Sequence, residues 1–134
     1  MDGRHLAFDD GAFDVVYSLS SIEHFGGFAG ARAAVMEMAR VLAPNGVLVV
    51  ATEYILSGPT YEEAFLPAEI HALFDLPGLE LVNAIDERVY ERYACGAVDL
   101  RVDIDRRPHM VVRVDDTVFT SVIVFLRKVD TRPA

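Results

Sequence analysis

The sequence has little cysteine and no long apolar run. Its 134 residues include a single cysteine, Cys95, which excludes an internal disulfide and is typical of proteins in a reducing compartment. No apolar run approaches the roughly 18 residues that a transmembrane helix requires, and no charged start leads into an apolar segment and a cleavage site. We therefore expect a cytoplasmic protein that makes no membrane contact.

Positive charge is also scarce. The chain has 12 Lys and Arg residues against 21 Asp and Glu residues, a net charge of −9, and no basic cluster is longer than Arg106-Arg107. Nucleic-acid binding relies on clustered cations, so no nucleic-acid partner is expected. The four histidines lack the spacing of metal ligands, and one cysteine cannot complete a thiolate site, so no metal is expected.

The stretch from Phe13 to Phe25 organises the rest of the chain. Its first seven residues, FDVVYSL, are mostly apolar, aromatic or β-branched, which is typical of a strand buried on both faces in a parallel sheet. Small serines follow, at positions 18, 20 and 21, where the strand ends. Ligands of open α/β sheets bind outside the carboxyl ends of strands, so we expect the chemistry at these serines and at Ile22-Glu23-His24.

The remaining pattern predicts one α/β domain over residues 1–134. Apolar residues recur along one stripe from about Gly30 to Leu42, which predicts a helix. Pro44-Asn45-Gly46 ends it, with Asn45 suited to a left-handed conformation. Further elements are predicted as a buried strand at Val47–Thr52 with Glu53 and Tyr54 at its carboxyl end, a helix at Ala68–Phe74 behind Pro67, and strands at Leu79–Ile85 and Val118–Val129.

Residues 86–116 have no clear periodicity. They mix tyrosines, Cys95 and many charges, and they are too long for an ordinary connection. We expect an insertion within the domain, either a hairpin or a helix and loop.

Two segments together resemble a known family. They are DGRHLAFDDGAFDVVYSLSSIEHF and, after the predicted helix, ARVLAPNGVLVVATE. This text resembles the carboxyl-terminal half of a class I S-adenosylmethionine-dependent methyltransferase of the small-molecule type. The resemblance implies a partial Rossmann-like sheet of about four strands, mixed, with the last strand antiparallel and with helices mainly on one face.

The resemblance also implies residues for the cofactor, S-adenosylmethionine. Asp2 would accept a hydrogen bond from the adenine amino group, the backbone of Gly3 would lie against the base, and the backbone of Ser18 and Leu19 would flank the cofactor. The alternative for Asp2 is a solvated terminal residue, and for Ser18 an ordinary chain-reversal serine. From the residues themselves, His24 is a candidate general base, or else a histidine held by nearby backbone at a helix start. Glu53 and Tyr54 are candidates for the substrate side.

The family's glycine-rich cofactor loop has no counterpart in this sequence. We therefore expect methyl transfer to a small molecule only if a complete site is assembled, and weak cofactor binding by this chain alone. The alternatives are a binding or structural oligomer that has lost the cofactor site, and a fragment of a longer methyltransferase. Without a neighbouring strand, Phe13–Leu19 has an unpaired apolar edge, so we expect a homo-oligomer formed through it.

Overall fold

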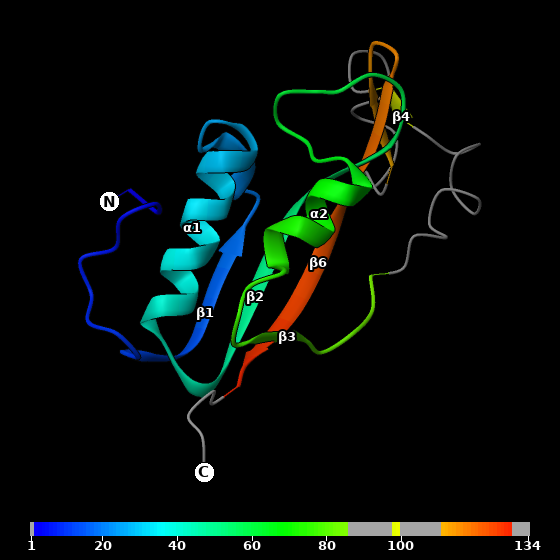
Figure 1. The fold of residues 1–134 in the computed structure, drawn as a ribbon. Helices are drawn as coiled ribbons and strands as arrows, with labels where there is room; N and C mark the ends of the chain where they lie inside the picture. The colour runs from blue at the N-terminus through cyan, green and yellow to red at the C-terminus, as the bar shows by residue number, and fades with distance from the viewer. Residues whose placement is uncertain (1, 86–97, 100–110, 130–134) are drawn as a thin grey trace.

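The computed structural model describes residues 2–85, 98–99 and 111–129, in which both helices pack on one face of a mixed sheet (Figure 1). The expected α/β class is confirmed. In chain order the elements are β1 (Phe13–Leu19), a 3₁₀ turn η1 (Ile22–His24), α1 (Gly27–Val41), β2 (Leu42–Ser57), α2 (Pro67–Phe74), β3 (Leu79–Leu81), β4 (Val98–Asp99), β5 (Val112–Val114) and β6 (Thr117–Lys128).

The first two strands run parallel and are joined by α1. Val16 pairs with Leu48, and Leu19 pairs with Ala51. Strand β1 ends beside Ala51, and β2 runs on for six more residues in the same direction. The predicted site segment, which follows β1, therefore lies beside Thr52 of β2.

The last strand, β6, is antiparallel to β2, as expected. Its other edge pairs with β3 and with β5, so the strand order is β1-β2-β6-β5-β4 with β3 also beside β6. The sheet has six strands instead of the expected four, because two short strands, β4 and β5, extend it past β6. Both lie in the stretch that was hardest to interpret from sequence.

The bounds of several strands differ from those predicted from the sequence. Strand β2 begins at Leu42, directly after the helix, and runs on to Ser57, well beyond the predicted Val47–Thr52. Asn45 has the expected left-handed backbone, with φ of 65°, at a shift in the β1–β2 register. The strand predicted at Leu79–Ile85 ends at Leu81.

The hydrophobic core fills the space between the sheet and the two helices. From the sheet, Leu48 and Leu126 are fully buried, and from α2, Ile70 and Leu73 are as well. The apolar stripe of α1 supplies Ala31, Ala34, Val35 and Met38. The buried side chains lie on one face of the sheet, and both helices pack on that face to cover them.

The opposite face of β1, β2 and β6 is bare, which corrects the expectation that β1 is buried on both faces. Val15, Tyr17 and Leu19 of β1 are 60%, 71% and 59% exposed. Across the sheet, Tyr17 is aligned through Val49 of β2 with Phe125 of β6, and Leu19 is aligned through Ala51 with Ile123. Phe125 and Ile123 are also exposed. We call these five side chains the bare face. Strand β1 also forms one edge of the sheet.

The insertion expected at residues 86–116 lies mostly outside the described residues, which include only 98–99 and 111–116 of it. Of the helices in the described part of the chain, none is long and apolar enough to cross a membrane.

Candidate functional site

The chain turns sharply where β1 ends. Ser20 has a left-handed backbone, with φ of 44°, and its N–H donates to the carbonyl of Ala51 at 2.9 Å. A serine in this conformation is uncommon, and such backbone often occurs at functional positions. The turn directs the chain into η1, which places Glu23 beside Thr52 of β2.

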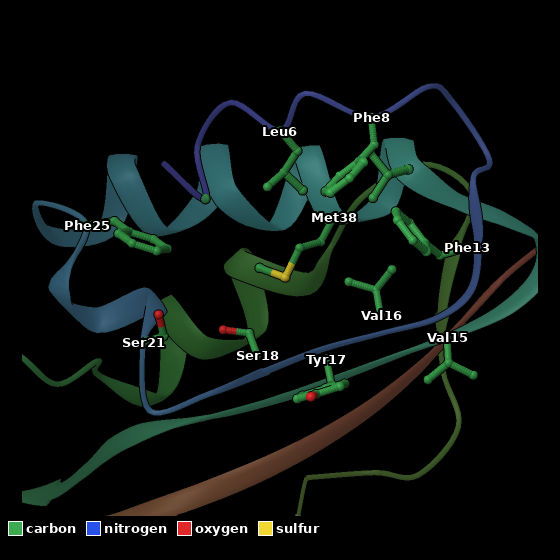
Figure 2. A pocket seen from close by; sticks show the side chains of 12 residues that line it. Leu6, Phe8, Phe13, Val15, Val16, Tyr17, Ser18, Ser21, Phe25 and Met38 are labelled. Atoms are coloured by element: carbon green, nitrogen blue, oxygen red, sulfur yellow. The ribbon is translucent and has the colours of Figure 1, made fainter. Parts of the chain in front are cut away.

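A groove of about 390 Å³ runs along the side of β1 that faces α1 (Figure 2). We call it the β1 groove. Figure 2 shows Val16 and Ser18 pointing into it towards α1, while Val15 and Tyr17 point the other way. Its lining residues are Gly3, Leu6, Phe8, Phe13, Val15, Val16, Tyr17, Ser18, Ser21, Phe25, Met38 and Val41. Two of the predicted cofactor residues, Gly3 and Ser18, therefore lie in one groove.

At the carboxyl end of the groove, Gly3 packs against the ring of Phe25. A Cβ atom at Gly3 would lie 2.8 Å from two atoms of that ring, closer than real contacts allow. A larger residue at position 3 therefore requires the ring of Phe25 to shift. The role predicted for the Gly3 backbone, against a cofactor base, stays a prediction. The flat ring of Phe25 was missed, because a lone aromatic residue after a serine-rich turn carries no distinguishing signal.

The carboxylate of Asp2 is bound by Arg4. The Arg4 backbone N–H donates to Oδ1 at 2.9 Å, and Nη2 donates to Oδ2 at 2.8 Å. These hydrogen bonds lower the pKa of Asp2 to about 2. Arg4 also donates from Nη1 to the carbonyl of Phe25 at 3.3 Å, so Asp2 belongs to an ordered turn at the rim of the groove. A ligand amino group has to share its oxygens with Arg4.

The N-terminal arm, residues 2–11, is tied to α1 by an acid–base pair. Glu37 Oε2 accepts from the backbone N–H of Leu6 at 2.9 Å, and Glu37 also binds Arg40, which together lower its pKa to about 2. Arg40 reaches the carbonyls of Leu6 and Phe8, each at 2.9 Å. These contacts hold Leu6 and Phe8 over the groove. The signal in the sequence is the i, i+3 spacing of Glu37 and Arg40.

A second group of polar side chains surrounds His24. Its Nδ1 lies 3.1 Å from Glu63 Oε1, and its Nε2 lies 3.9 Å from Glu23 Oε1. Glu23 is only 3% exposed, and its Oε2 accepts from the hydroxyl of Thr52 at 2.8 Å. Sequence reasoning found His24 but missed Glu63 and Thr52, because they are brought to the histidine from distant parts of the chain.

The two candidates predicted after the second buried strand, Glu53 and Tyr54, lie in different surroundings. Glu53 lies near this group, and its carboxylate accepts from Ser121 Oγ at 3.0 Å. Burial raises the pKa of Glu53, and the neighbouring negative charge of Glu23 adds to the effect. Tyr54, in contrast, is 5% exposed and belongs to the core, so its placement on the substrate side was wrong.

Two regions therefore adjoin where β1 ends beside Ala51 of β2. The β1 groove collects Gly3 and Ser18, with Asp2 at its rim, and the other region centres on His24. The side chain of Leu19 lies on the bare face, so only its backbone is available to the groove side. Among the residues that the structure describes, no group of three or more His, Cys, Asp or Glu side chains is placed to hold a metal ion.

Comparison with known proteins relates the first part of the chain to a family and the whole chain to a fold. Residues 1–50 match the sequence model of a family described as methyltransferase domain. The fold is that of a methyltransferase domain. No curated protein sequence matches the chain.

Three solved structures with this fold are similar over almost the whole chain. They are the [4+2]-cyclase SpnF, with 17% identity and a TM-score of 0.60, phosphoethanolamine N-methyltransferase 2 of Haemonchus contortus, with 13% and 0.58, and a SAM-dependent methyltransferase of Methanosarcina mazei, with 12% and 0.57. Each match covers 96% of this chain but only 54%, 36% and 65% of the respective structure. The methyltransferase-like chain thus spans about two thirds or less of each of these proteins.

Proposed function

We propose that this chain is part of an S-adenosylmethionine-dependent methyltransferase that acts on a small molecule, with the rest of the cofactor site supplied by polypeptide outside the chain. One observation carries the proposal: every residue that lines the β1 groove falls within residues 1–50, the segment that matches the methyltransferase family. The groove runs along a parallel strand and reaches the carboxyl end of that strand at Ser18 and Ser21, where α/β proteins bind ligands. The single cysteine supports a cytoplasmic location.

The residues present fit the adenine side of the cofactor. The groove is lined largely by apolar side chains and has the flat ring of Phe25 at one end, which suits a flat heterocycle. Backbone at Gly3 and the hydroxyl of Ser18 provide polar groups near that ring, and Asp2 provides a carboxylate at the rim. At about 390 Å³ the groove is near the lower limit for a small-molecule site, so it would hold only part of such a ligand.

The activity proposed for this site depends mainly on positioning. The cofactor supplies a methyl carbon made electrophilic by its bond to a positively charged sulfur. The chain's residues would hold the adenine side in the β1 groove, with the acceptor beside the His24 group, which aligns the two reactants. His24 stands next to that position and would accept the proton that the acceptor loses.

The proposal is tested by titrating the ¹⁵N-labelled chain with S-adenosylmethionine. We expect weak, millimolar binding that shifts the amide resonances of Gly3, Ser18 and Phe25. Ser18→Leu, which fills the groove, should abolish the shifts, and Ser57→Leu, in the part of β2 that extends six residues beyond its pairing with β1, should leave them unchanged. Absence of any shift at millimolar cofactor would refute the groove as its site, and micromolar affinity would refute the need for further polypeptide.

The bare face favours a second candidate, a binding or structural oligomer. The fold alone does not decide the reaction, since one protein that shares it is named as a cyclase. An apolar sheet face beside an unpaired strand edge is an association site unless it is covered. We propose that a second copy of the chain covers it.

The charges at the two ends of the bare face suit a two-fold arrangement. In the pairing of β2 with β6, Arg127 is aligned with Val47 at one end of the bare face. Glu53 is aligned with Ser121 at the other end. When two copies stack with their strands reversed, Arg127 of each copy lies over Glu53 of the other. Such self-complementarity is what a two-fold interface requires.

Sedimentation equilibrium at tens of micromolar tests this arrangement. We expect a dimer for the unmodified chain and a monomer for Tyr17→Glu, which puts a charge at the centre of the bare face. Met36→Glu is the control, because Met36 is an equally apolar, exposed side chain on α1, away from that face. A monomeric unmodified chain, or equal effects of the two variants, would overturn the proposal.

A further inference from the structure

His24 lies between two carboxylates that differ in exposure. Glu63 comes from the segment between β2 and α2, and its side chain is 51% exposed, like that of His24 at 52%. Glu23, next to His24 in η1, is almost fully buried and is held by the hydroxyl of Thr52. The histidine is thus accessible on one side and faces fixed negative charge on the other.

The contact with Glu63 determines which ring nitrogen carries the hydrogen. An ionised carboxylate has only acceptor oxygens, so the 3.1 Å contact is a hydrogen bond only if His24 Nδ1 bears the hydrogen. A neutral imidazole with a hydrogen on Nδ1 has an unprotonated Nε2. The 3.9 Å from Nε2 to Glu23 Oε1 is too long for a direct hydrogen bond, so Glu23 does not occupy that nitrogen.

We propose that Glu63 is a positioning residue that holds His24 in the Nδ1–H tautomer, so that Nε2 takes the proton from the methyl acceptor. This inference rests on the proposed methyltransferase function and narrows the acceptor to molecules whose nucleophilic atom carries a proton, such as an amine or a hydroxyl. The acceptor's lone pair forms the bond to the methyl carbon, the electrons of the broken carbon–sulfur bond stay on sulfur, and the proton moves to Nε2. Glu63 and Glu23 then face the imidazolium that forms, as carboxylates do in acid–base–nucleophile triads.

The tautomer is measured in the chain itself, without cofactor or acceptor. Long-range ¹H–¹⁵N correlation spectra at about pH 8.5, roughly two units above the ordinary pKa of histidine, distinguish a hydrogen on Nδ1 from one on Nε2. We expect Nδ1–H for His24 in the unmodified chain and a shift towards Nε2–H in Glu63→Ala. Glu63→Gln should keep the Nδ1–H form, because its amide oxygen still accepts.

Glu62→Ala is the matched control. Glu62 is the preceding residue, is exposed, and carries the same charge, so its removal changes the local electrostatics without removing the hydrogen bond. An Nε2–H form in the unmodified chain, or the same spectrum for Glu63→Ala and Glu62→Ala, would overturn the proposal. Because the measurement needs no methyl transfer, failure of the cofactor titration leaves this result standing, and failure here leaves the titration standing.

Discussion

The buried contact between Thr52 and Glu23 allows a quantitative prediction. Thr52 is 0% exposed, Glu23 is 3% exposed, and the hydroxyl of Thr52 donates to Glu23 Oε2 at 2.8 Å. Thr52→Val keeps the shape of the side chain but removes the donor, which leaves a buried carboxylate oxygen short of a partner. A hydrogen bond to a charged group contributes about 1.5–3 kcal/mol, so we expect a loss of that size in the free energy of unfolding.

The assay is urea unfolding followed by circular dichroism. A fall in the midpoint at constant slope reports lost stability, whereas a changed slope reports an altered denatured or native state. For a chain of this size each kcal/mol corresponds to roughly 3–4 °C, so the melting temperature should fall by about 5–12 °C.

Thr60→Val is the control for this prediction. It makes the same substitution at an exposed loop position, where we expect a change within about 0.5 kcal/mol. If Thr52→Val has an equally small effect, the carboxylate of Glu23 is hydrated and the reasoning from burial is wrong.

Three further predictions concern the attachment of α1 and the N-terminal arm. Lys128 donates from Nζ to the carbonyls of Ala39 at 2.8 Å and Leu42 at 2.6 Å, so Lys128→Met should lower the free energy of unfolding by about 1–2 kcal/mol in the same urea assay, and an unchanged midpoint would contradict this. The pKa of Glu37 is lowered to about 2, so its contribution to the free energy of unfolding is present above its ordinary pKa and is lost as the pH falls towards 2. Glu37→Gln should therefore flatten the pH dependence of the urea midpoint between about pH 4.5 and 2. An unchanged pH dependence would contradict this. Gly3→Ala should lower stability by about 1 kcal/mol and shift the ring resonances of Phe25, since the added Cβ collides with that ring, and unshifted resonances would show that the two do not pack.

The elements that the sequence determined are those set by local pattern. Strand β1 begins and ends where the apolar run Phe13–Leu19 does, because a sustained run of β-branched and aromatic residues suits only a strand. The stripe of α1, the start of α2 at Pro67 and the left-handed Asn45 likewise follow from helical spacing and single-residue backbone preferences. The class of fold and the position of the candidate site at the end of β1 follow from the order of these elements.

Tertiary structure alone decided which residues meet at the site. His24 and Glu63 are 39 positions apart, and Glu23 and Thr52 are 29 apart, so no local pattern relates them. The same holds for the exposure of Val15 and its neighbours: apolar composition predicts burial, but burial depends on what another element places over the face. Local propensity acts over a few residues along the chain, whereas hydrogen bonds and burial depend on distances in space that only the assembled sheet and helices set.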